Sequence, residues 1–142
     1  MKKVILLFTA LFFVFAATVQ AHGPVRGKMT ATVKINASAD KVWAVIKNFD
    51  DMSWHPMITN VKAKGGNKKG ATRTLTLTTG AILTEKLKTY KDDKMSYKYK
   101  MTDISIAKTI QHSGKEEQVP DLPVKNYSAK ISVKGKGGSS EV

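Results

Sequence analysis

The sequence of 142 residues contains no cysteine. This absence excludes disulfide bonds, thiolate metal ligands and the lipid attachment that a lipoprotein needs, so stability must come from a hydrophobic core. The three histidines, His22, His55 and His112, include no pair at the i, i+4 spacing of helical metal ligands. The sequence therefore predicts neither a metal site nor a cofactor.

Catalytic motifs are also missing. The chain has no G-x-S-x-G signature, and its glycine-rich stretch at 65–70 does not match the spacing of a phosphate-binding loop. No spacing suggests a carboxylate pair, and we expect the single acids Glu85, Asp92, Asp93 and Asp103 to be solvated or in turns. The sequence therefore predicts no catalytic residue and favours a binding protein over an enzyme.

Arginine is scarce although the chain is strongly basic. Lysine and arginine total 24 against 11 acidic residues, for a formal net charge of +13, and only Arg26 and Arg73 are arginines. Bidentate recognition of bases favours arginine, whereas scattered lysines provide a diffuse positive field. This composition points away from nucleic acid and toward an acidic protein or an anionic membrane surface. The alternative is the ordinary solvated surface of a basic protein.

The chain contains one long hydrophobic run, from Val4 to Val19, preceded by Met1-Lys2-Lys3. Val19-Gln20-Ala21 places small residues at the −3 and −1 positions of a signal-peptidase site. A membrane anchor is the alternative, but the run is shorter than the roughly 18 residues that a spanning helix needs. We expect export with cleavage after Ala21, leaving a single domain over residues 22–142 without a stable membrane anchor.

One segment has helical periodicity. Val42, Val45, Ile46 and Phe49 fall at i, i+3, i+4 and i+7, and Ser38 is placed to cap the helix N-terminus. The remaining segments alternate as strands do. Strands are predicted at 30–35, 58–64, 72–79, 82–90, 94–101 and 127–134, with a hairpin turn at 135–138 and a long, irregular connection at 102–123 that includes some strand at 104–110. This order predicts an α+β fold in which a curved antiparallel sheet grips the helix.

Four stretches carry a resemblance to a known family. They are 35–43, 49–56, 70–75 and 122–127. Over roughly residues 28–142 the sequence resembles the helix-grip superfamily of START, pollen-allergen-like and polyketide cyclase/dehydrase domains, also called SRPBCC. The resemblance implies a ligand cavity between sheet and helix and a long C-terminal helix after the last strand. Because the sequence ends at Val142, we expect a domain that is truncated at its C-terminus.

The predicted cavity residues are those of the apolar strand faces and of the segment that would lie at the opening of the implied cavity. An aromatic face at 95–101 suits either an ordinary core or a ligand wall, and Trp54-His55-Pro56 lies where the family's cavity opens. The ligand-cavity candidates are Trp54, His55, Leu75, Leu77, Met95, Tyr97, Tyr99 and Tyr127. The partner-binding candidates are the strand lysines Lys86, Lys88, Lys98 and Lys100.

Within the superfamily, the signal peptide, Trp54-His55-Pro56 and the segment 122–127 are similar to the periplasmic MxaD-type proteins of methanol oxidation. That similarity implies a periplasmic, non-enzymatic accessory protein that helps methanol dehydrogenase work with its cytochrome c acceptor. Two alternatives stay open. One is a carrier or sensor of a small hydrophobic or aromatic ligand, and the other is a cyclase- or dehydratase-like enzyme that uses His55 with Asp50 or Asp51.

Overall fold

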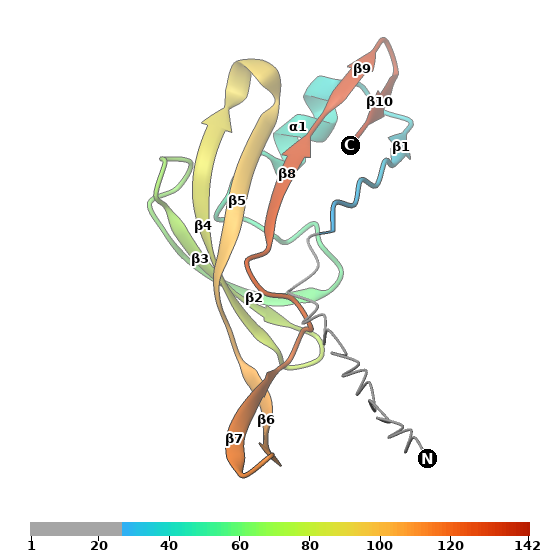
Figure 1. Cartoon of the computed structure of the whole chain (residues 1–142). Helices are drawn as coiled ribbons and strands as arrows, with labels where there is room; N and C mark the ends of the chain where they lie inside the picture. The colour runs from blue at the N-terminus through green and yellow to red at the C-terminus, as the bar shows by residue number, and fades with distance from the viewer. Residues whose placement is uncertain (1–26) are drawn as a thin grey trace, which may run out of the picture. The chain divides into compact units, whose positions relative to one another are not determined.

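The computed structural model describes residues 27–142, and the chain divides into two units, Met1–Thr30 and Ala31–Val142. All secondary structure of the described residues lies in the second unit (Figure 1). The predicted signal peptide, residues 1–21, lies outside the described residues. Among the residues that are described, no helix has the length and apolar character needed to cross a membrane.

The predicted helix is α1, Ala39–Ile46, with the Ser38 side chain accepting a hydrogen bond from the Lys41 amide at 3.4 Å. Its buried residues are Val42, Trp43 and Ile46. The predicted apolar stripe was wrong in one position, because Val45 is 56% exposed and Trp43 points into the core instead. The helix also ends before Phe49, which is fully buried from the loop that follows.

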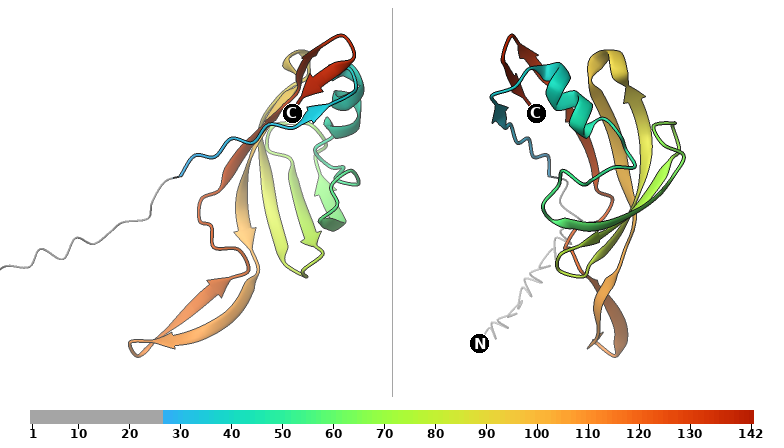
Figure 2. Two further views of the ribbon diagram at one scale, coloured as in Figure 1. Left: turned by 90° about the vertical axis from the view of Figure 1, so that its right-hand side faces the viewer. Right: turned by 180° about the vertical axis from the view of Figure 1, so that it is seen from behind.

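A five-stranded antiparallel sheet carries most of the fold. Its order is β2-β3-β4-β5-β8, and it curves around α1, which lies on the concave side (Figure 2). The strands are β2 Ile58–Lys64, β3 Thr72–Leu77, β4 Ile82–Lys91, β5 Ser96–Ile104 and β8 Ser128–Ser132. The turn expected at Asp92-Asp93 is the short 3-10 helix η1, Asp92–Lys94. Mostly antiparallel sheet with one short helix is consistent with the predicted helix-grip fold.

Three shorter strands form a separate antiparallel sheet of order β1-β10-β9. Only Val133 separates β8 from β9, Lys134–Lys136, which pairs with β10, Ser139–Glu141, and β10 pairs in turn with β1, Lys34–Ile35. The hairpin between β9 and β10 needs glycine at 135, because a Cβ there would clash with the Ser139 carbonyl oxygen and the Ser140 backbone. The predicted hairpin is present, but its turn is limited to Gly137 and Gly138, because Gly135 and Lys136 belong to β9.

Several strand predictions need correction at their ends. The strand predicted at 72–79 ends at Leu77, and the strand predicted at 127–134 is limited to Ser128–Ser132. The first strand is shorter than predicted, because Ala31 and Val33 are exposed and outside it, although Val33 exchanges two backbone hydrogen bonds of 3.0 Å with Val142. The strand predicted from Lys94 begins at Ser96. Met95 adopts a left-handed backbone conformation, with φ of 40°, that ends η1. A residue in that conformation cannot continue the strand alternation.

The segment predicted as an irregular connection is largely regular. It forms β6, Ile106–His112, and β7, Lys115–Pro120, a two-stranded ribbon that extends beyond the five-stranded sheet (Figures 1 and 2). Ser105 and Asp121 close its base, because the Asp121 amide donates to the Ser105 carbonyl at 2.9 Å and the Ser105 hydroxyl donates to the Asp121 carboxylate.

Candidate functional site

The concave face holds a buried ion pair. Arg73 of β3 and Glu85 of β4 are direct cross-strand neighbours, and the Arg73 Nε donates to Glu85 Oε2 at 2.7 Å. Their side chains are only 1% and 6% exposed. The expectation that Glu85 is solvated was wrong. The alternation of side chains along β4 could have predicted this burial. Leu83, Glu85 and Leu87 are every second residue, so all three face the same side of the sheet, which is the core.

Arg73 also fastens the loop after α1 to the sheet. Its Nη1 donates to the Phe49 carbonyl at 3.0 Å and lies 3.0 Å from Met52 Sδ. The guanidinium carbon sits 4.3 Å from the centre of the Phe49 ring and 4.9 Å from that of Tyr99, which are cation–π distances. Burial raises the pKa of Glu85, and the charge and hydrogen bond of Arg73 oppose that shift.

Aromatic rings fill the space between α1 and the sheet. Tyr97, 1% exposed, has ring centres at 6.0 Å from Trp43, 6.2 Å from Phe49 and 6.1 Å from Tyr99. Burial raises the pKa of Tyr97 and of Tyr99. The Tyr97 hydroxyl has no hydrogen-bond partner among the described residues. A hydroxyl that is buried and unpaired costs free energy, so the Tyr97 hydroxyl is a polar position in the cluster that a ligand could satisfy.

The Trp43 indole ties α1 to the turn between β4 and β5. Asp92 accepts a hydrogen bond of 2.7 Å from Trp43 Nε1 and one of 3.2 Å from the Tyr90 hydroxyl. The Trp43 bond is the main reason that the pKa of Asp92 is lowered. Burial, followed by the bond to Asp92, raises the pKa of Tyr90 to about 12. The middle of the helix is thus fixed to the β4–β5 turn through Asp92, and the loop after the helix is fixed to the sheet through Arg73.

The predicted cavity residues are only partly brought together. Tyr97 and Leu75 are buried on the concave face, and Tyr99 is half-buried beside Arg73. Leu77, Met95 and Trp54 are half-buried, while Tyr127 is 43% exposed. The aromatic residues on this face therefore pack mainly against one another and against the helix, as a core does.

The acid–base set of the enzyme alternative is not assembled. His55 Nδ1 accepts from the Met57 amide at 3.2 Å, and its ring stands edge-on to Trp54 at 5.5 Å. Asp51 accepts from the Ser53 amide at 2.8 Å, the bond that most lowers the pKa of Asp51. Within the described residues no hydrogen bond joins His55 to either aspartate. A hollow of about 260 Å³ includes both aspartates in its lining but not His55.

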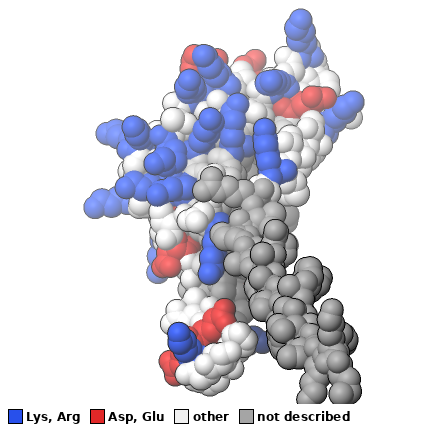
Figure 3. All heavy atoms as spheres, viewed as in Figure 1, with Lys and Arg blue, Asp and Glu red and all other residues white. Residues whose placement is uncertain are grey.

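The outer face of the same sheet is basic. Figure 3 shows lysines crowded over the part of the surface formed by β4, β5, β8 and β9. The strand register explains this crowding, because Lys86 is paired with Lys100 and Lys98 with Lys130. Lys91 lies on the same face, opposite Ser96. We call these five residues, Lys86, Lys91, Lys98, Lys100 and Lys130, the lysine face.

Three of the four predicted partner-binding residues lie on the lysine face. The fourth, Lys88, is exposed. The pairing of β4 with β5 shifts between Leu87 and Thr89, so Lys88 has no residue of β5 opposite it. Lys91 and Lys130 were missed by the sequence analysis, and only the register shows that they are neighbours of Lys98. Within residues 27–142 the contacts of 4.0 Å or less between basic and acidic side chains are Arg73–Glu85 and His112–Glu117, so no lysine of this face has a carboxylate within 4.0 Å.

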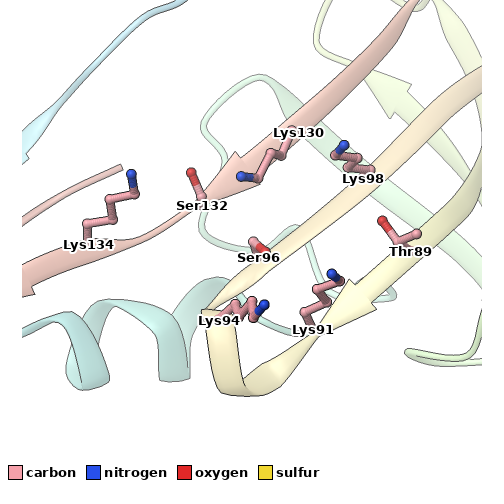
Figure 4. Close-up of a pocket in the computed structure, with 8 residues that line it drawn as sticks. All are labelled: Thr89, Lys91, Lys94, Ser96, Lys98, Lys130, Ser132 and Lys134. Atoms are coloured by element: carbon pink, nitrogen blue, oxygen red, sulfur yellow. The ribbon is translucent and has the colours of Figure 1, made fainter.

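A hollow of about 370 Å³ lies at one end of the lysine face. Its lining, shown in Figure 4, includes five lysines and three hydroxyl residues and no acidic residue. The lysines are Lys91, Lys94, Lys98, Lys130 and Lys134. The hydroxyl residues are Thr89, Ser96 and Ser132. We call this feature the lysine hollow.

The curved sheet, the helix on its concave side and the buried face between them define a helix-grip domain. The chain belongs to the family described as polyketide cyclase / dehydrase and lipid transport, whose sequence profile matches residues 26–142. A search of curated protein sequences found no match. The superfamily identified from the sequence is therefore confirmed.

Solved structures support the same fold. A protein named XoxI from Bacillus cereus is 25% identical with a TM-score of 0.60, over 78% of this chain and 67% of that one. An uncharacterized protein from Bacillus thuringiensis is 24% identical with a TM-score of 0.60, over 78% of this chain and 69% of that one. Norcoclaurine synthase from Thalictrum flavum is 19% identical with a TM-score of 0.51, over 78% of this chain and 62% of the enzyme.

Proposed function

We propose that the protein is a non-enzymatic accessory protein that docks on an acidic partner through the lysine face. The observation that carries this proposal is the register, which sets Lys86 against Lys100 and Lys98 against Lys130, with no carboxylate of residues 27–142 within 4.0 Å of these lysines. Like charges placed directly opposite each other destabilise a sheet. Acidic side chains of a partner would offset that cost, and the positive field would speed the encounter.

The resemblance to MxaD-type proteins suggests who that partner is. Under this proposal the chain is exported to the periplasm and assists methanol dehydrogenase in working with its cytochrome c acceptor. An acidic redox protein carries the negative charge that complements the positive lysine face. The separation of His55 from Asp50 and Asp51 in the hydrogen-bond network favours this role over a cyclase-like activity.

The salt dependence of association tests the proposal. Raising the ionic strength from about 10 mM to about 150 mM shortens the screening length from about 30 Å to about 8 Å. We expect the affinity for methanol dehydrogenase or cytochrome c, measured by surface plasmon resonance, to fall at least about tenfold, mainly through slower association. An affinity that does not change with salt would contradict docking through the lysine face.

A matched pair of variants shows whether the location of the charge matters. K86Q/K100Q removes two charges from the lysine face, and K108Q/K115Q removes two from the β6–β7 ribbon, where both lysines are exposed. We expect weaker binding from the first variant and nearly unchanged binding from the second. Equal losses in both would mean that only net charge counts.

A carrier of a small hydrophobic or aromatic ligand is the second candidate function. It is favoured by the buried Tyr97 hydroxyl, which has no partner among the described residues, and by the family's link to lipid transport. A neutral probe such as N-phenylnaphthylamine should then quench the fluorescence of Trp43, whose ring lies 6.0 Å from Tyr97. The Tyr97→Phe variant should bind the probe at least as well but a phenol less well. No response of Trp43 to any apolar probe would exclude the carrier.

A further inference from the structure

We propose that the lysine hollow is a binding site for a compact anion that carries several phosphate groups. The proposal does not rest on the proposed function, because the hollow could hold such an anion whether or not the lysine face docks a protein.

The donors come from a regular part of the sheet. Thr89, Lys98 and Lys130 form one cross-strand row on β4, β5 and β8, and Lys91, Ser96 and Ser132 form the next row on the same face. Strand pairing fixes the backbone positions of these six residues. Figure 4 shows amines and hydroxyls from both rows around one space, with Lys94 and Lys134 at its border.

Most of the charge in the hollow is not compensated by the protein. No carboxylate lines it, and within residues 27–142 none of its five lysines is part of an ion pair. Two acidic residues lie beside its border lysines, because Glu141 of β10 is paired with Lys134 and Asp93 precedes Lys94. Asp92, the acidic residue at the start of the adjacent turn, is already engaged by the Trp43 indole and the Tyr90 hydroxyl. Five ammonium groups that share one space repel one another, so a multivalent anion gains attraction and relieves repulsion when it enters.

Charge density favours phosphate over carboxylate as the group that fills the hollow. A phosphate group carries about −1.5 to −2 charges and three strong acceptor oxygens, whereas a carboxylate carries one charge, and each lysine offers a point charge with three rotatable N–H donors. The hollow has lysines and no arginine, and Ser96, 7% exposed, offers a hydroxyl at its floor. A volume of about 370 Å³ corresponds to roughly a dozen water molecules at about 30 Å³ each. That space accommodates a short chain of phosphates.

The test uses tripolyphosphate as the soluble probe and isothermal titration calorimetry on the folded protein at about 0.1 M salt, where long-range attraction is largely screened. We expect saturable binding of one ion per chain. K98Q/K130Q should weaken that binding at least about tenfold, which corresponds to about 1.4 kcal/mol. K98R/K130R should retain it. Circular dichroism and the unfolding midpoint should show that the variants fold.

The control variant removes the same charge from elsewhere on the sheet. Lys62 and Lys64 of β2 are exposed and lie opposite Thr74 and Thr72, two rows that continue the outer face. K62Q/K64Q should change the affinity for tripolyphosphate less than about twofold, because these charges act only through screened solvent. Equal weakening by the two glutamine variants, or binding that does not saturate, would overturn the proposal.

The phosphates could belong to a soluble metabolite or to a lipid headgroup. Vesicles of phosphatidylglycerol, titrated at matched phosphate concentration, distinguish these sources. Binding of tripolyphosphate that K98Q/K130Q abolishes, with vesicle binding absent, identifies a soluble ligand. Vesicle binding that K98Q/K130Q alone abolishes identifies a headgroup. The site is overturned if K98Q/K130Q weakens neither tripolyphosphate binding nor vesicle binding. It is also overturned if K62Q/K64Q causes the same loss.

Discussion

Replacement of Glu85 by glutamine is expected to lower the free energy of unfolding by roughly 3–5 kcal/mol, the range for removing one partner of a buried ion pair. The change leaves the Arg73 guanidinium, with a side chain that is 1% exposed, without a negative charge. Arg73 cannot lose its proton to escape this cost. Urea unfolding followed by circular dichroism would measure the effect.

Two controls separate the ion pair from other causes. The double variant R73M/E85L removes both charges and should recover most of the loss, because no unpaired charge stays buried. Its remaining deficit reflects the bonds that Arg73 makes to Phe49 and Met52. E117Q breaks the exposed His112–Glu117 pair and should cost less than about 1 kcal/mol. Stability of E85Q within about 1 kcal/mol of the parent protein would contradict this account.

Replacement of Lys98 by glutamate is expected to have opposite effects on stability and on binding. The new carboxylate would face Lys130 across the β5–β8 pair, turning a repulsion into an attraction worth roughly 0.2–1 kcal/mol of added stability. The same change places a negative charge in the centre of the lysine face. We therefore expect association with the acidic partner to weaken by more than about tenfold at low salt.

The two expected effects, higher stability and weaker binding, distinguish this prediction from misfolding, which would lower both. A variant that is more stable and binds less well has lost a functional surface and not its fold. K108E, on the β6–β7 ribbon, makes the same change in net charge away from the lysine face and is the matched control. Calorimetric unfolding and surface plasmon resonance would report the two effects. Unweakened binding by K98E would remove the lysine face from the docking surface.

Local sequence patterns predicted much of the sheet. Strand β2 spans the predicted residues 58–64, and the turns at Asp92-Asp93 and within 135–138 lie where turn residues interrupt the alternation. These features depend on neighbours in the sequence, so a single chain reveals them. The helix was predicted less well, because Trp43 is drawn inward by Asp92, a residue 49 positions away that helical periodicity cannot include.

The lysine face was only half predictable for the same reason. Alternation along β5 places Lys98 and Lys100 on one face, but their cross-strand partners depend on register. An irregularity between Leu87 and Thr89 shifts β4 by one residue, and therefore Thr89 and not Lys88 stands opposite Lys98. Such a shift has no clear sequence signature. Lys94 and Lys134 join the hollow from a turn and from another strand, which only the fold brings together.

The closed base of the β6–β7 ribbon makes its length independent of the rest of the fold. Ser105 and Asp121 join the two strands where they leave the sheet, and every residue of β6 is exposed. Residues beyond that junction contribute little to the core, so selection can lengthen, shorten or rewrite them at small cost in stability. The ribbon is thus the part of this domain whose length and sequence can change at small cost in stability, while the ion pair and the aromatic cluster are constrained by packing.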